Sequence, residues 1–68
     1  MQRDYLKGLM TEKHKSGIYL AEKLGVHQET FYRKMRTGSF FVKEAEIISR
    51  ELGITDPDKL VWVWTTED

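Results

Sequence analysis

This 68-residue chain contains no cysteine, so neither a disulfide nor a cysteine-based zinc site can stabilise it. Its longest apolar run extends only from Leu60 to Trp64, whereas a helix needs roughly 20 apolar residues to cross a bilayer. The opening residues are polar and carry no apolar stretch typical of a secretory signal. We therefore expect one complete, soluble, cytoplasmic domain over residues 1–68, without a membrane partner.

The sequence also lacks a net charge, because its 11 basic and 11 acidic residues cancel. Proteins that bind nucleic acid usually present a basic surface, so this balance argues against such a partner. The charges are unevenly distributed, however. Residues 1–38 contain eight basic and four acidic residues, a net charge of +4, and residues 39–68 contain three basic and seven acidic residues, a net charge of −4. This polarity is compatible with a basic binding face in the first part, and equally with a solvated surface of mixed charge.

The residue types used in catalysis and metal binding form no recognisable set. His14 and His27 lie 13 positions apart, without an accompanying carboxylate motif. The sequence has no glycine-rich phosphate loop, nucleophile–base pair or pair of catalytic carboxylates. We therefore expect no enzymatic activity, no catalytic residue, no metal, no cofactor and no small-molecule substrate.

The sequence does contain a succession of helical patterns. The spacing of apolar and capping residues predicts five helices, at about 3–14, 16–24, 27–36 and 42–52 and from Asp56 and Pro57 onward. Ser16 is a good N-cap, and Gly25 suits the left-handed backbone that follows many helices. In the tail, 61–68, valine and tryptophan alternate, which is compatible with the end of the fifth helix or with a short extended strand. The predicted fold class is all-α, with that tail left open.

The segment from Leu20 to Phe31 is the most informative part of the chain. It predicts a helix, a turn at Gly25 and a second helix that begins with polar residues. The small side chain of Ala21 would let the two helices approach closely. Two helices joined this tightly can place a polar helix face in the major groove of DNA. The alternative is an ordinary helical hairpin within a small bundle.

The second helix of this pair has a polar face. A helical wheel places five residues on it: Gln28, Glu29, Tyr32, Arg33 and Arg36. Glutamine can pair with adenine, glutamate can accept from cytosine, and arginine can bind guanine. Tyr32 can donate its hydroxyl to a phosphate or place its ring against a thymine methyl. We predict that the first four of these residues read DNA bases; the alternative is a helix face that is polar only for solubility.

Residues that can contact DNA phosphates flank this helix on both sides. The predicted phosphate contacts are Lys15, Ser16, His27, Arg36, Thr37, Ser39 and Lys43. Free backbone N–H groups and the positive end of a helix would assist those near a helix start. For each lysine the alternative is a solvated charge.

The segment Leu20–Phe31 resembles the helix-turn-helix of lambdoid phage repressors, Cro proteins and the wider family named after the xenobiotic response element repressor. The run from Phe40 to Gly53 also looks like the fourth helix of small prophage regulators, so the resemblance covers about residues 16–53. It implies a compact five-helix, lambda-repressor-like domain whose helix-turn-helix core spans about residues 16–36.

This resemblance also implies a function. The family regulates transcription by placing its third helix in the major groove of operator duplex DNA, where the bound protein blocks or recruits polymerase. The first residues of that helix touch bases, which here implies Gln28 and Glu29, followed by Tyr32 and Arg33.

Three residues depart from the family's pattern. Gly17 stands where members often carry a glutamine that anchors a phosphate. His27 replaces the commoner serine or threonine cap, so we expect the third helix to be less well capped. Lys34 falls where an apolar residue usually packs inward. Either its stem packs on the core while its ammonium group reaches solvent, or the helix ends early.

The tail carries two tryptophans that are costly to expose at the end of a chain. A helix-turn-helix monomer reads only a half-site, and two-fold operators need paired subunits. The predicted dimer or partner surface comprises Val61, Trp62, Val63 and Trp64. We expect one tryptophan to pack in the core and the other to lie at the interface. Two alternatives to DNA binding stay open: a protein-interaction module of the same fold, and an antitoxin-like protein whose tail binds a partner.

Overall fold

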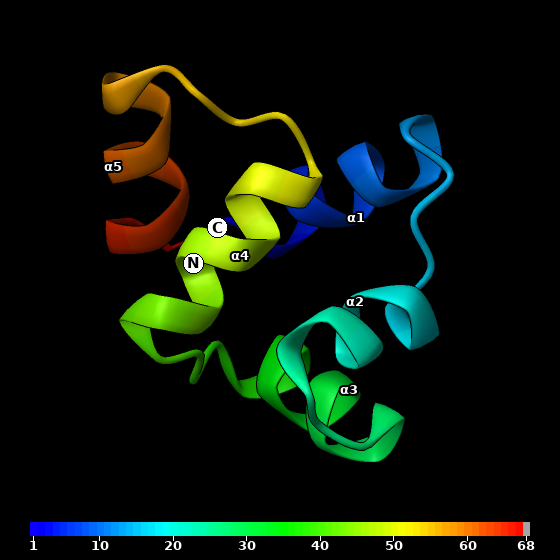
Figure 1. The fold of residues 1–68 in the computed structure, drawn as a ribbon. Helices are drawn as coiled ribbons and strands as arrows, with labels where there is room; N and C mark the ends of the chain where they lie inside the picture. The colour runs from blue at the N-terminus through cyan, green and yellow to red at the C-terminus, as the bar shows by residue number, and fades with distance from the viewer. Residues whose placement is uncertain (68) are drawn as a thin grey trace.

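The computed structural model describes residues 1–67, which form five α-helices joined by short turns (Figure 1). The helices are α1 (Arg3–Glu12), α2 (Gly17–Leu24), α3 (Gln28–Thr37), α4 (Val42–Glu51) and α5 (Pro57–Thr65). The predicted all-α class is therefore confirmed, and within residues 1–67 the tail is helical through Thr65 rather than extended. Asp68, the last residue of the predicted tail, lies outside the described residues. In the described part of the chain, no helix combines the length and the apolar character needed to cross a membrane.

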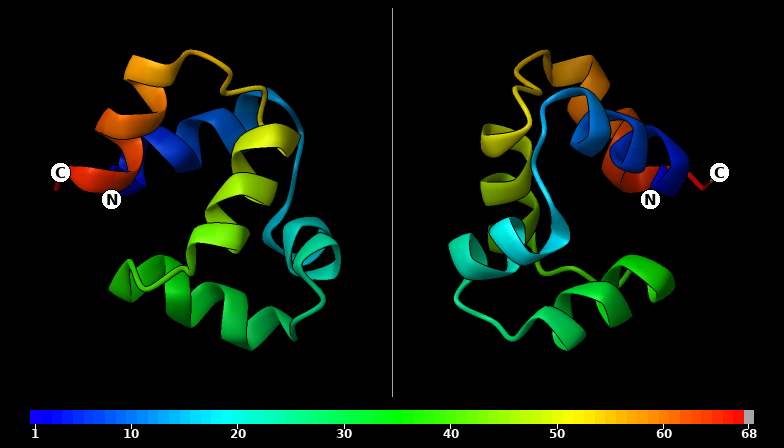
Figure 2. Two further views of the ribbon diagram at one scale, coloured as in Figure 1. Left: turned by 60° about the vertical axis from the view of Figure 1, so that its left-hand side comes forward. Right: turned by 90° about the vertical axis from the view of Figure 1, so that its right-hand side faces the viewer.

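The helices α2 and α3 are joined by the three residues 25–27. Helix α2 packs against both α3 and α4. Figure 2 shows α3 along one edge of the molecule, while α1 and α5 lie at the opposite side. One flank of α3 therefore faces away from the other four helices.

Local capping explains where the helices begin and end. The Ser16 hydroxyl accepts the N–H of Tyr19 at 3.0 Å, as its N-cap role predicts. Gly25 ends α2 with φ at 73°, a left-handed conformation that a side chain would strain. At the start of α5, Asp56 accepts the N–H of Asp58 at 3.0 Å, and Pro57 occupies the first turn.

The core lies where the five helices converge. Each helix contributes a fully buried side chain: Leu6, Leu20, Phe31, Ile48 and Val63. An aromatic row extends this core, because the ring centroid of Phe40 lies 5.6 Å from that of Phe31 and 6.0 Å from that of Trp64. The Trp64 indole N–H donates to the Ser49 hydroxyl at 2.8 Å, so its polar atom is satisfied inside the fold.

The start of α1 is tied to the ends of two other helices. The Arg3 guanidinium donates to the carbonyls of Met35 and Arg36 at 2.9 and 2.8 Å, and thereby caps the C-terminal end of α3. The backbone N–H of Gln2 donates to the carbonyl of Val63 in α5 at 2.8 Å. The contacts of Arg3 help to fix the orientation of α3 relative to α1, and that of Gln2 does the same for α5.

Candidate nucleic-acid interface

Helix α3 lies along one edge of the molecule (Figure 2), and one of its flanks carries a row of exposed side chains. The row comprises the five residues that the helical wheel placed together: Gln28, Glu29, Tyr32, Arg33 and Arg36. The opposite flank is anchored by Phe31, which is fully buried. A shallow, open hollow of about 600 Å³ runs along the exposed row. The structure thus brings the predicted base-reading residues together on one accessible surface.

The imidazole of His27 caps the start of this helix. Its Nδ1 atom accepts the N–H of Glu29 at 3.2 Å, so Nδ1 carries no proton in this arrangement. Glu29 adds a negative charge in the first turn, where the helix dipole favours one. The departure from serine or threonine therefore leaves α3 with a side-chain cap, and His27 itself stays exposed at the turn.

Lys34 turns inward from α3 and is only 8% exposed. Its ammonium group donates to both carboxylate oxygens of Glu44 in α4, at 2.8 and 2.9 Å, and lies 4.1 Å from the centroid of the Phe41 ring. Both expectations for Lys34 are wrong, because α3 continues to Thr37 and the ammonium group finds a partner inside the fold. The pair joins α3 to the first turn of α4.

The ionisation of Glu44 is set by two opposing influences. Burial favours the neutral carboxyl group. The hydrogen bonds from Lys34 and from the backbone N–H of Phe41, together with the charge of Lys34, outweigh it and hold the pKa of Glu44 below its ordinary value of 4.5. The Glu44 carboxylate accepts the backbone N–H of Phe41, which is one of the two hydrogen bonds of a capping box. The second cannot form, because the Phe41 side chain has no acceptor.

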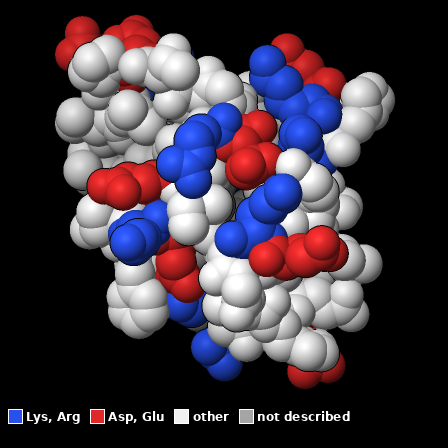
Figure 3. Space-filling model, in the orientation of Figure 1, with Lys and Arg blue, Asp and Glu red and all other residues white. Residues whose placement is uncertain are grey.

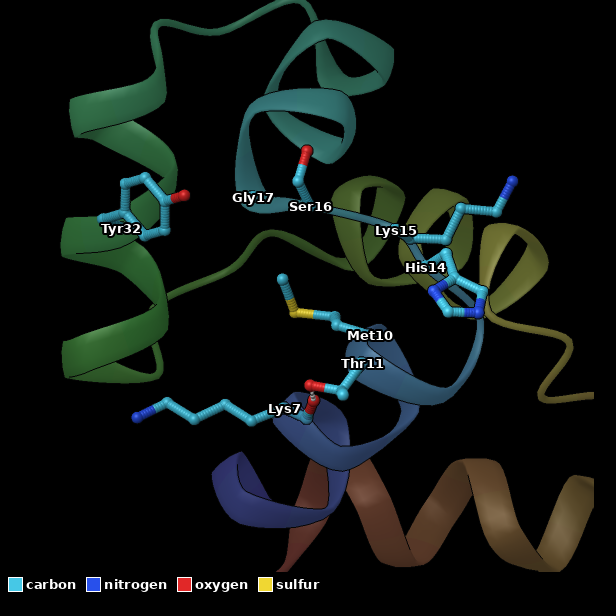
Figure 4. A pocket seen from close by; sticks show the side chains of 8 residues that line it. All are labelled: Lys7, Met10, Thr11, His14, Lys15, Ser16, Gly17 and Tyr32. Carbon is cyan, nitrogen blue, oxygen red and sulfur yellow. Dashed lines mark hydrogen bonds between the residues drawn. The ribbon is translucent and has the colours of Figure 1, made fainter.

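Gly17, another of the three departures from the pattern of the family that the sequence resembles, lies against the ring of Tyr32 (Figure 4). A β-carbon at Gly17 would lie 2.5 Å from the Cε1, Cζ and Oη atoms of Tyr32. The ring also meets Phe31 edge to face, with the ring centroids 5.7 Å apart. The missing side chain at the start of α2 therefore makes room for a tyrosine from α3.

Two of the predicted phosphate contacts lie near the start of α2. Ser16 is exposed close to Tyr32, whereas the Lys15 side chain points away from Tyr32 in Figure 4. The Lys15 ammonium group lies 3.5 Å from the hydroxyl of Tyr19, which itself donates to Glu51 at 2.7 Å. The hydrogen bond from Tyr19 holds the pKa of Glu51 below its ordinary value, although burial opposes it. Because its ammonium group lies beside the Tyr19 hydroxyl, Lys15 is already engaged at the contact between α2 and α4.

The other predicted phosphate contacts lie near the C-terminal end of α3 and the start of α4. Arg36, Thr37, Ser39 and Lys43 are all exposed there. The hydroxyls of Thr37 and Ser39 lie 2.7 Å apart and hydrogen bond to each other. Together with Ser16 near the start of α2, the candidate phosphate contacts therefore flank the exposed row on two sides.

The four residues of the predicted partner surface are divided by the helical form of α5. Val61 and Trp62 are 60% and 39% exposed, whereas Val63 is fully buried. Trp64 packs against the core and is the tryptophan that turns inward. Trp64 is thus the tryptophan expected in the core, whereas Val63 is buried and does not belong to the predicted partner surface. The reason is that a helix turns by 100° at each residue and does not alternate its side chains as a strand does. Of the four residues, Val61 and Trp62 therefore stay exposed. The ring centroid of Trp62 lies 5.2 Å from that of Tyr5 in α1.

The charge polarity along the sequence does not become two separate blocks on the face drawn in Figure 3. Lysine and arginine alternate there with aspartate and glutamate, and uncharged side chains cover most of α5. Because the net charge of the chain is also zero, a local arrangement of side chains, rather than the net charge, must carry any binding of nucleic acid.

Sequence reasoning missed two side chains that position α3, namely Arg3 and Glu44. A glutamate three residues after a helix start is a capping signal that could have identified Glu44. No local pattern identifies Arg3, because its partners lie at the far end of another helix.

Comparison of the chain with protein-family models, curated proteins and solved structures gives no match.

Proposed function

We propose that this chain is a sequence-specific duplex DNA-binding protein that regulates transcription, with α3 lying in the major groove. The observation that carries the proposal is the exposed row on α3, at an edge of the molecule where no other helix covers it. A single α-helix fits the major groove, which is about 12 Å wide. The resemblance of residues 16–53 to prophage repressors and Cro proteins points to the same use of this helix.

The chemistry of the row suits direct reading of base edges. Gln28 can bind adenine through both its amide atoms, and Arg33 can bind guanine through two N–H groups. Within the chain, the side chains of Gln28, Glu29 and Arg33 form none of the hydrogen bonds or ion pairs found among residues 1–67, so they are available to an external partner. Ser16, Thr37, Ser39 and Lys43 would contact phosphates beside them. The bound domain would act sterically, by blocking or recruiting polymerase.

Selection from random duplex DNA tests this proposal and identifies the operator at the same time. We expect Arg33→Ala to relax the preference at one base pair by about 1–3 kcal/mol, because that base loses its two hydrogen bonds. Lys43→Ala is the matched control: it should weaken binding to all sequences alike, and it should reduce the dependence of affinity on salt. The absence of binding to random duplexes at low salt would reject the proposal.

One observation favours a second candidate, a protein-interaction module. The net charge is zero and charges of both signs mix on the surface in Figure 3, whereas DNA-binding domains usually present a basic face. In this alternative the exposed apolar residues, among them Phe41 and Val42, would contact a protein. An antitoxin-like partner protein is a form of the same alternative. A failure of the DNA selection together with a folded protein would favour it.

We further propose that two copies pair through the exposed residues of α5 to read both halves of a two-fold operator. Val61→Asp should then lower self-association, measured by sedimentation across a range of concentrations with and without operator DNA. Val42→Asp is the matched control, because Val42 is even more exposed, at 78% against 60%, and lies on α4. Sedimentation of the unmodified protein as a monomer at high concentration, both alone and on operator DNA, would contradict the pairing.

A further inference from the structure

A second hollow, of about 620 Å³, lies between Tyr32 of α3 and the residues of α1 and of the start of α2 (Figure 4). It is bordered by α1 and by the start of α2, and the Met10 side chain points into it. Tyr32 borders both hollows and so forms the wall between them. Three residues of this lining were assigned no role by the sequence: Lys7, Thr11 and His14.

The lining of this second hollow differs in charge from that of the exposed row. It contains Lys7 and His14, together with Lys15, whose ammonium group is engaged by Tyr19, but, within the described residues, no aspartate or glutamate. The hollow along α3, in contrast, includes the carboxylate of Glu29. Although the protein as a whole has no net charge, the second hollow is a place where an anion would meet no acidic neighbour in the lining.

The hydroxyl of Tyr32 is held at this second hollow by packing. The ring lies against Gly17, and Figure 4 shows the hydroxyl directed toward the start of α2. Among residues 1–67 this hydroxyl forms no hydrogen bond, so it can donate one to a ligand. The contact with Gly17 holds the tyrosine at the α2 side of α3.

We propose that the second hollow binds a backbone phosphate of duplex DNA, and that Tyr32 is a phosphate contact rather than a base-reading residue. This inference rests on the proposed function, because the major groove that would hold α3 is bordered by phosphates on both sides. The Tyr32 hydroxyl donates to the phosphate oxygen, Lys7 supplies the positive charge from α1, and the exposed imidazole of His14 supplies a further donor. Helix α1 thus belongs to the interface.

The test measures binding of a random-sequence duplex of about 20 base pairs, roughly two helical turns. Tyr32→Phe should lower the affinity about tenfold for every sequence in the pool, because one hydrogen bond to a charged oxygen is lost. The consensus returned by selection should stay the same, whereas a base-reading tyrosine would change it. Lys7→Met should reduce the slope of log affinity against log salt by about 0.9.

Lys13→Met is the matched control, because Lys13 also lies at α1 but lines a different hollow, beside Gly53. It should leave both the affinity and the salt slope unchanged. The Tyr32 ring resonances in NMR spectra should shift with the duplex and not with inorganic phosphate at equal ionic strength, which separates a DNA phosphate from a free one. Circular dichroism checks that each variant is folded.

The outcomes separate the two proposals. If the unmodified protein binds no duplex at low salt, both the proposed function and this inference are rejected. If it binds duplex DNA and Tyr32→Phe changes the consensus, only the inference is overturned. The same holds if Tyr32→Phe leaves the affinity unchanged and Lys7→Met leaves the salt slope unchanged. If Tyr32→Phe does not fold, the salt slope of Lys7→Met, at an exposed position of α1, decides alone.

Discussion

Phe31→Ala is expected to remove a large part of the stability of the domain, lowering its free energy of unfolding by about 3–5 kcal/mol at 25 °C. The Phe31 side chain is fully buried, and its ring packs against the ring of Phe40 at a centroid distance of 5.6 Å. Truncation of a buried phenylalanine costs about 3–5 kcal/mol, whereas a domain of this size has a total free energy of unfolding of roughly 3–10 kcal/mol. Urea unfolding followed by tryptophan fluorescence would measure the loss, because Trp64 reports directly on this core.

Phe41→Ala is the matched control for this experiment. The same side chain is removed ten positions further along the chain, where it is 69% exposed. Its main contact is the ammonium group of Lys34 over its ring, and we expect a loss of less than about 1 kcal/mol. Similar losses for the two variants would contradict the burial that the structure assigns to Phe31.

The second large effect concerns the ion pair between α3 and α4. We expect Lys34→Met to lower the free energy of unfolding by about 3 kcal/mol at neutral pH, because it leaves the carboxylate of Glu44 inside the fold without its cation. The side chains of Lys34 and Glu44 are only 10% and 12% exposed, so water cannot replace the missing partner well. Lys43→Met, at an exposed neighbouring position, should have little effect.

The double variant Lys34→Met/Glu44→Gln makes this prediction sharper. It should be more stable than Lys34→Met alone, because no uncompensated charge is then buried. If each single variant loses less than about 1 kcal/mol and the losses are additive, the two side chains do not interact as the structure shows.

The same pair predicts a dependence of stability on pH. The pKa of Glu44 is lower in the folded protein than its ordinary value of 4.5. The stability that this carboxylate contributes is therefore fully present above about pH 5, and is lost as the pH falls through the lowered pKa of the folded state. Over that acid range the unmodified protein should lose more stability than Glu44→Gln, which has no carboxyl group to protonate. Urea unfolding at a series of pH values measures the difference.

The fold class was predictable from the sequence because its signals are local. Ser16, Gly25 and Asp56 each act within a few residues of themselves, and each caps a helix as expected. The tail was not predictable, since alternating valine and tryptophan are compatible with a helix and with a strand. Contacts with distant elements decide it: Val63 enters the core and Trp64 donates to Ser49 of α4.

The candidate site was predictable as a helix face but not as an arrangement in space. A helical wheel is enough to bring Gln28 and Arg33 together, because both lie on one element. The positions of Gly17 and Lys34 depend on how α3 packs against α2 and α4, and no pattern within one helix contains that information. In the sequence both residues are unexplained departures from a family's pattern, whereas in the structure each has a partner: Tyr32 packs against Gly17, and Glu44 pairs with Lys34.

The side chains that hold α3 and those that it displays are separate sets. Arg3, Phe31 and Lys34 attach the helix to the rest of the fold, whereas Gln28, Glu29 and Arg33 extend from it without intramolecular hydrogen bonds or ion pairs among residues 1–67. Substitutions in the displayed set should therefore cost little stability. A library randomised at those three positions would consist mainly of folded proteins, so the domain offers a 68-residue, cysteine-free scaffold for selecting new recognition surfaces.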